Sequence, residues 1–124
     1  MKSQQNQQST QAVGEAVRLD RVIHMLGLAT KAGKTQSGTF LTEDAVRARK
    51  ARLVLIAEDA EANTRKTIED KCRSYHVPVV YAGTKEQLGQ AMGKGIRSCA
   101  AILDPGFAQS ISKLTGACTQ EGRE

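Results

Sequence analysis

The stretch Leu53-Val-Leu-Ile-Ala57 is a continuous apolar run with the length of one β-strand. A strand that is apolar at every position, rather than at alternate positions, is typical of a sheet covered on both faces. Two more short apolar runs follow, over residues 77–82 and 98–103. Pro78 stands near the start of the first, where a strand tolerates proline. The chain therefore predicts a sheet buried between two layers.

The segments around these strands have helical spacing. Leu19, Val22, Ile23 and Leu26 recur at helical intervals, and Gly33 follows where that helix would end. Further helices are expected over residues 39–50, 63–75 and 85–92, and from 106 to about 114, with residues 35–37 as a short strand. Helices that alternate with strands predict an α/β protein, here a three-layer α/β/α sandwich with a small mixed four-stranded sheet.

The chain has the length of one domain with a single core, because it holds 124 residues. Residues 1–17 are rich in Gln, Ser and Thr and have no apolar face, which predicts a disordered polar tail. We expect the folded domain over residues 18–116 and a frayed C-terminus over residues 117–124.

The charge of the chain favours an anionic partner. Its 18 Lys and Arg exceed its 13 Asp and Glu, which gives a formal net charge of +5. Two Phe, two Tyr and no Trp argue against a broad aromatic platform for single strands. No apolar run is long enough to span a bilayer and the start lacks a secretory pattern, so we expect a cytoplasmic protein without membrane contact. The widely spaced Cys72 and Cys99 are expected to be buried, reduced thiols.

Signals for catalysis are weak. Gly33-Lys-Thr35 ends like a phosphate loop, but Leu28 stands where that motif needs its first glycine. His24 and His76 have no neighbours at metal-ligand spacing. Glu58, Asp59 and Glu61 crowd a strand end, which a solvated turn explains as well as acid–base chemistry does. We therefore expect a protein that is not an enzyme and needs neither cofactor nor metal.

The stretch Lys31-Ala-Gly-Lys-Thr-Gln-Ser-Gly-Thr39 is the strongest candidate for a binding site. If a helix begins at Gly38 and Thr39, its unsatisfied N–H groups would suit phosphate, with Lys31 and Lys34 expected beside them. Phe40 falls on the polar side of that helix, so it is either partly exposed or packed at the rim of the core. Gly93-Lys-Gly-Ile-Arg97 is a second basic loop, expected to be flexible.

The order of motifs along the chain resembles the ribosomal protein "seven Ae" family, and more narrowly its small bacterial YlxQ-like branch. The resemblance covers about residues 20–114. The motifs are Leu53-Val-Leu-Ile-Ala-Glu-Asp-Ala60, Asn63-Thr64, Asp70-Lys-Cys72, Val77-Pro-Val79, Leu88-Gly89, Met92-Gly-Lys94, and Asp104 with Gly106-Phe-Ala108.

This resemblance implies the same sandwich and recognition of kink-turns, which are sharply bent internal loops in duplex RNA. In the family, the RNA surface joins the Gly-rich start of the second helix to the loop before the last strand, here residues 38–44 and 94–97. The chain departs from the family pattern, since Phe40, Leu41 and Asp44 stand where other members carry Asn, Glu and Lys. Hydrogen bonds to base edges therefore do not carry over to Phe40 or Leu41, and shape would count for more than sequence.

We thus predict a monomeric, non-catalytic RNA-binding protein that contacts structured RNA, either a kink-turn or ribosomal RNA, and associates with the ribosome. The predicted RNA-binding residues are Lys31, Lys34, Gly38, Thr39, Phe40, Arg47, Lys94, Gly95, Ile96 and Arg97. The alternative is a protein–protein interaction adaptor on the same fold, with Phe40, Leu41 and Ile96 as its apolar contact patch.

Overall fold

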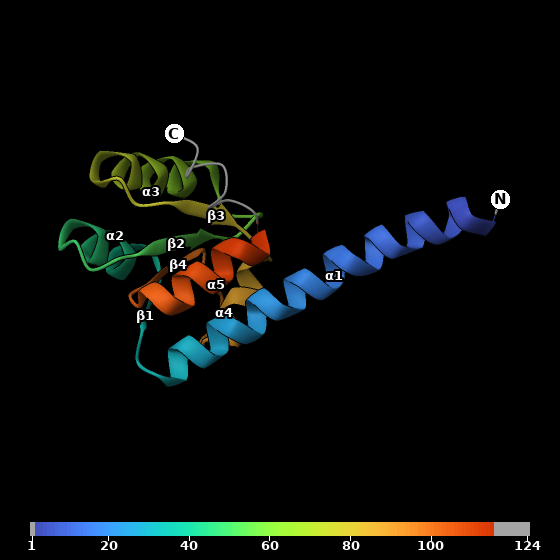
Figure 1. The fold of residues 1–124 in the computed structure, drawn as a ribbon. Coiled ribbons are helices and arrows are strands. Elements are labelled where there is room, and N and C mark those ends of the chain that lie inside the picture. Colours follow the sequence, from blue (N-terminus) through green and yellow to red (C-terminus); the bar gives the residue numbers. More distant parts are fainter. Residues whose placement is uncertain (1, 116–124) are drawn as a thin grey trace.

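Over residues 2–115, five helices and four strands alternate (Figure 1). The structure, a computed structural model, describes residues 2–115, with side chains described from Val17 onward. The elements are α1 (Lys2–Lys31), β1 (Thr35–Ser37), α2 (Thr39–Arg47), β2 (Leu53–Ile56), α3 (Ala62–Tyr75), β3 (Val79–Tyr81), α4 (Lys85–Ala91), β4 (Cys99–Ile102) and α5 (Pro105–Thr115).

The four strands form one mixed sheet in the order β1-β4-β2-β3. The last strand in the chain, β4, lies between β1 and β2 and is antiparallel to both, whereas β2 and β3 are parallel. The register pairs Ile102 with Thr35 on one side and with Leu53 on the other. The starts of β1 and β2 therefore lie at the same end of the sheet, on either side of the end of β4.

Helices cover both faces of the sheet. On one face α1 packs against α4 and α5, and on the other α2 packs against α3 (Figure 1). These contacts make three layers, which confirms the predicted α/β/α sandwich with a small mixed four-stranded sheet.

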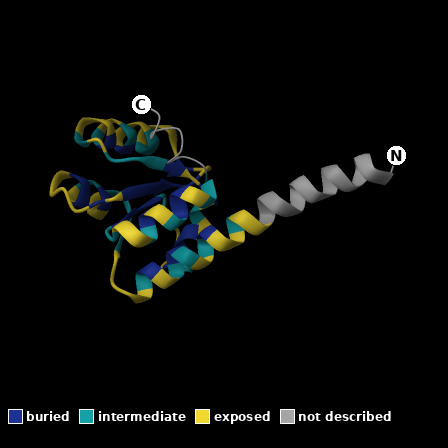
Figure 2. Cartoon of the chain, in the orientation of Figure 1, coloured by how far each residue is buried: buried dark blue, intermediate teal, exposed yellow. Residues whose placement is uncertain are grey.

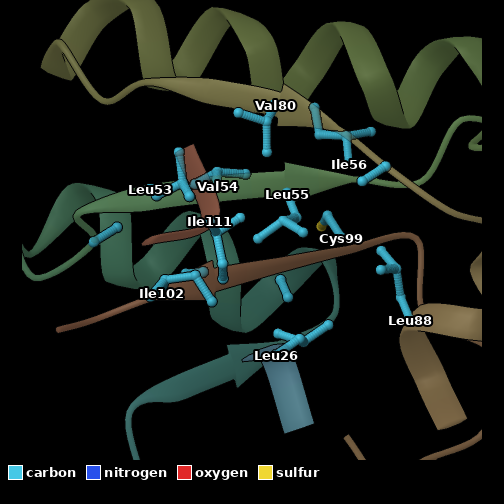
Figure 3. Close-up of a cluster of buried hydrophobic side chains, with 14 of the residues drawn as sticks. Leu26, Leu53, Val54, Leu55, Ile56, Val80, Leu88, Cys99, Ile102 and Ile111 are labelled. Carbon is cyan, nitrogen blue, oxygen red and sulfur yellow. The ribbon is translucent and has the colours of Figure 1, made fainter. Parts of the chain in front are cut away.

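The core lies on the two central strands. Every residue of β2 and β4 is buried, as the continuous apolar run predicts for strands covered on both faces (Figure 2). Leu26, Leu88 and Ile111 bring the apolar faces of α1, α4 and α5 into this core and are fully buried (Figure 3). Burial of side chains of this size contributes about 1.5–3 kcal/mol each to folding.

The N-terminal segment differs from the expectation. The sequence predicts a disordered tail over residues 1–17, whereas α1 begins at Lys2. Gln and Ala are good helix formers, and a helix already formed can be extended without an apolar face. The expected domain limits of 18 and 116 stay a prediction, and the expected frayed segment 117–124 lies outside the described residues.

Candidate nucleic-acid interface

Gly38 opens α2 and leaves its first turn uncapped. Its φ of 92° lies in a region that side chains disfavour, which explains the glycine. The Gly38 N–H donates to the Cys99 carbonyl at 2.9 Å, so it is not available to a ligand as the sequence suggested. No side chain caps the helix start, and the N–H groups of the next three residues, Thr39 to Leu41, are those that a helix leaves without an internal acceptor. These three groups and the positive end of the helix dipole can receive an anion.

The loop between α4 and β4, residues 93–97, is held against α4 rather than free. The Lys94 N–H donates to the Gly89 carbonyl at 2.7 Å, and the Arg97 N–H donates to the Lys85 carbonyl at 3.1 Å. A Cβ on Gly89 would overlap the Gly95 carbonyl oxygen and lie 2.6 Å from its carbon. Because the two backbones approach so closely, the position of this loop depends on Gly89.

Arg97 joins the loop to the start of α2. Its Nε donates to Ser37 Oγ at 3.4 Å and its Nη1 donates to the Ile96 carbonyl at 2.9 Å. The Arg97 Cδ would lie 3.7 Å from a Cβ on Gly38, so the side chain lies over the helix start. A fixed positive charge therefore stands beside the uncapped N–H groups.

The loop and the helix start form the walls of an open groove of about 370 Å³. The groove is lined by Ser37, Gly38, Thr39, Phe40, Leu41, Ile96, Arg97 and Ser98. Phe40 is 74% exposed and Ile96 is 65% exposed, so the exposed alternative for Phe40 is the one observed. The structure thus brings together five of the predicted site residues, namely Gly38, Thr39, Phe40, Ile96 and Arg97.

The other predicted residues lie elsewhere. Lys34 precedes β1 and Gly38 follows it, and an extended strand rises about 3.3 Å per residue, so their Cα atoms lie about 13 Å apart. Lys31 and Lys34 are therefore at the opposite end of the sheet from the groove. Arg47 lies in the last turn of α2, about 10 Å along the axis from Phe40, and pairs with Asp44 at 3.6 Å.

Lys94 and Gly95 are exposed in the same loop as Ile96 and Arg97 but do not line the groove. Two residues that shape the site were not predicted from the sequence: Ser37, which accepts the hydrogen bond from Arg97, and Gly89, which leaves room for the loop. Gly89 could have been noticed in the sequence. A glycine inside a helical pattern costs stability, so its presence there indicates a packing reason such as the close approach of another backbone.

The carboxylates considered for acid–base chemistry, Glu58 and Asp59, are a solvent-exposed side chain and a hydrogen-bond acceptor for a backbone N–H. Asp59 Oδ1 accepts the Lys85 N–H at 2.8 Å at the first turn of α4, and Glu58 is exposed. Within residues 17–115, no three His, Cys, Asp or Glu side chains are grouped so as to hold a metal ion. No helix in the described part of the chain combines the length and the apolar character needed to cross a membrane.

The structural class is defined by two features. The fold is an α/β/α sandwich with a mixed sheet, and the loop before the last strand lies beside a helix that begins at a glycine without a side-chain cap. The chain belongs to the ribosomal protein L7Ae/L30e/S12e/Gadd45 family, whose model matches residues 20–112. This confirms the resemblance seen in the sequence motifs.

Relatives in this family resemble the chain over most of its length. It is 41% identical over 90 residues to the RNA-binding protein YlxQ of Bacillus subtilis (strain 168), covering 73% of this chain and 90% of that protein. It is 36% identical over 94 residues to the RNA-binding protein YlxQ of Enterococcus faecium, covering 76% of this chain and 90% of that protein.

Two solved structures share the fold. One is a Bacillus halodurans protein of unknown function, with a TM-score of 0.73 and 34% identity, covering 77% of this chain and 96% of that one. The other is the Giardia lamblia 15.5kD RNA binding protein, with a TM-score of 0.62 and 23% identity, covering 82% and 85% of the two chains. The second likeness concerns the fold alone.

Proposed function

We propose that this chain is a non-catalytic RNA-binding protein whose groove contacts a sharply bent RNA loop such as a kink-turn. The observation that carries the proposal is the uncapped start of α2, with Arg97 over it and the exposed Phe40 and Ile96 on either side. Relatives named RNA-binding proteins, 41% and 36% identical to this chain, support it. In the same proposal the protein acts as a monomer in the cytoplasm, on ribosomal RNA and in association with the ribosome.

The groove offers different contacts to the phosphate and to the base of one nucleotide. Backbone N–H groups at Thr39 and Phe40 can donate to a phosphate oxygen, and Arg97 can balance its charge. An unpaired base can stack on the exposed Phe40 ring, while Ile96 provides an apolar contact on the facing loop. A regular duplex keeps its bases paired and stacked, so this combination favours a bent or interrupted RNA.

The groove should distinguish RNA base sequences only weakly. Leu41 has no polar group that could hydrogen-bond to a base edge, and the negative charge of Asp44 would repel a nearby phosphate. Shape recognition with phosphate contacts remains, and such binding weakens as salt rises because phosphate neutralisation releases counterions. Lys94 adds a cation in the same loop.

The test is binding of the purified protein to a labelled kink-turn RNA and to a straight duplex of equal length, at low and near-physiological salt. The proposal expects tighter binding to the kink-turn at both salts, and at least a tenfold loss with Arg97→Glu. Lys113→Glu on α5 is the matched control, because Lys113 is exposed and does not line the groove. Equal binding to both RNAs, or equal loss in both variants, would contradict groove recognition of a kink-turn.

A protein-interaction adaptor is the second candidate, favoured by the exposure of three apolar side chains, Phe40, Leu41 and Ile96, around the groove. The two candidates are distinguished by the RNA affinity of the unmodified chain and of the variants Arg97→Glu and Leu41→Ser. If the groove binds RNA, Arg97→Glu should lower the affinity more than Leu41→Ser, because phosphate contact needs the charge of the arginine. If the groove binds an apolar protein partner instead, the unmodified chain should show no detectable affinity for RNA, and binding of that partner should depend on Leu41.

A further inference from the structure

A second cationic surface lies at the opposite end of the sheet from the groove. We call it the basic end, and it consists of the five exposed cations Lys31, Lys34, Arg49, Lys50 and Arg52. Lys31 ends α1 and Lys34 lies in the α1–β1 connection, whereas the other three lie in the α2–β2 connection. Both connections are on the left side of Figure 1. From the sequence, Lys31 and Lys34 were predicted to bind RNA beside the start of α2, whereas the other three had no predicted role.

Hydrogen bonds to the end of β4 hold the two connections side by side. The Leu103 N–H donates to the Lys34 carbonyl at 2.8 Å, and the Arg52 N–H donates to the Ile102 carbonyl at 2.7 Å. Lys34 and Arg52 thus flank β4 from its two neighbouring strands. Since adjacent strands lie about 4.8 Å apart, their Cα atoms are about 10 Å apart.

In the part of the chain whose side chains the structure describes, the five cations of the basic end are free of ion pairs, and they are five of the 18 Lys and Arg of the chain. Within residues 17–115, none of the five has a carboxylate within 4.0 Å. Asp104 follows β4 by two residues, and its Oδ2 accepts the Phe107 N–H at 3.0 Å at the start of α5.

Arg49 occupies a backbone position that normally favours glycine. It follows α2 with φ at 62°, its N–H donates to the Val46 carbonyl, and the Lys50 N–H donates to the Ala45 carbonyl. This is the helix end at which glycine is usual. The Arg49 guanidinium lies 5.1 Å from the centre of the Tyr75 ring, which positions its charge.

We propose that the basic end binds the phosphate backbone of a second duplex RNA segment, so that one protein holds two RNA segments at opposite ends of its sheet. Among the described side chains, Leu28, one turn before Lys31, is the one exposed large apolar residue near this end. Protein interfaces are centred on apolar or aromatic anchors. Spaced cations without such anchors fit a phosphate backbone instead.

The test is a bridging assay. A kink-turn RNA is immobilised, the protein is added, and capture of a labelled straight RNA duplex is measured. The variant is Lys34→Glu with Arg52→Glu, and the control of equal charge is Lys66→Glu with Lys113→Glu, two exposed lysines outside both surfaces. The unmodified chain and the control should capture the duplex, and the variant should capture about tenfold less while holding the kink-turn RNA within about threefold.

No duplex capture by the unmodified chain, or equal capture by variant and control, overturns the second site and leaves groove binding to the kink-turn RNA standing. If the immobilised RNA does not retain the protein, the proposed groove function fails, and duplex titration in solution decides the second site alone. There the variant should lower the slope of log affinity against log salt by about two. The assignment of the basic end to RNA is overturned if the salt slopes of the variant and the unmodified chain are equal. It is also overturned if polyglutamate competes for the basic end as strongly as duplex RNA does.

Arg49→Gly separates charge from folding. Glycine relieves the left-handed position, so the variant should melt no lower than the unmodified chain. Its duplex affinity should nevertheless fall severalfold, because one phosphate contact is lost. Unchanged duplex affinity in this folded variant contradicts the role of Arg49.

Discussion

Arg97 Nε lies 3.4 Å from Ser37 Oγ, although the two residues are 60 positions apart in the chain. The bond connects the loop after α4 to the end of β1, and it places the guanidinium over the start of α2. A charge and a row of free N–H groups are thereby fixed relative to one another before any ligand arrives. This preorganisation is the structural basis of the proposed RNA contact.

Arg97→Ala should weaken kink-turn binding by at least about tenfold, because both a phosphate contact and a charge are lost. Stability should change by less than about 1 kcal/mol, since the side chain is only partly buried and its bond to Ser37 is long. Fluorescence anisotropy and thermal melting measure the two effects separately. Arg97→Lys keeps the charge, so its RNA affinity should lie between that of the unmodified chain and that of Arg97→Ala. If Arg97→Ala instead lowers the melting temperature strongly and leaves RNA affinity unchanged, Arg97 has only a structural role.

Phe40→Ala should lower RNA affinity by about 1–3 kcal/mol, the usual contribution of one base stacked on an aromatic ring. Phe40 is 74% exposed, so the free energy of unfolding should change by no more than about 0.5 kcal/mol. Phe40→Leu is the control that keeps an apolar side chain without the ring. If the leucine variant binds as tightly as the unmodified chain, the contact is apolar packing rather than stacking.

Gly89→Ala should destabilise the protein by about 1–3 kcal/mol, although helix propensity alone favours alanine by about 1 kcal/mol. The new Cβ would overlap the Gly95 carbonyl and push the loop away from α4. Gly95→Ala is the matched control, because nothing lies within 4 Å of its added Cβ. Denaturant titration distinguishes them, and a Gly89→Ala variant at least as stable as the control contradicts the close approach.

The buried thiols should resist alkylation near neutral pH. Burial raises the pKa of Cys72 to about 12 and also raises the pKa of Cys99. The thiolate is the reactive form, so at pH 8 only about one Cys72 thiol in ten thousand is ionised, and its fraction grows about tenfold per pH unit up to its pKa. Peptide mapping after iodoacetamide treatment reads each cysteine separately. Rapid native labelling of Cys72 that levels off near pH 9 would contradict its burial.

The sheet and its covering helices could be predicted from the sequence because their signals are local. The run Leu53-Val-Leu-Ile-Ala57 is fully buried as expected, and the expected burial of Cys72 and Cys99 is confirmed. The expected second helix, residues 39–50, ends earlier, at Arg47. There the chain turns through the left-handed Arg49, a conformation that its sequence does not favour.

The candidate site was only partly predictable, because charge along the chain does not say at which end of a strand each cation lies. Lys31 and Lys34 are close to Gly38 in sequence, but the three residues of β1 carry them to the opposite end of the sheet. A flexible loop was expected over residues 93–97, whereas hydrogen bonds to the Gly89 and Lys85 carbonyls hold it in place. Those contacts depend on tertiary packing and have no local pattern.

We propose that RNA enters the groove between the start of α2 and the loop before β4. The sharpest check is to titrate isotope-labelled protein with a kink-turn RNA and to follow the backbone amide resonances by nuclear magnetic resonance. We expect the largest shifts at Thr39, Phe40, Leu41 and Arg97, and the shifts of these four amides should saturate at one RNA per protein. Specific binding that leaves these four amides unmoved, or no binding at physiological salt, would rule out the groove as the RNA site.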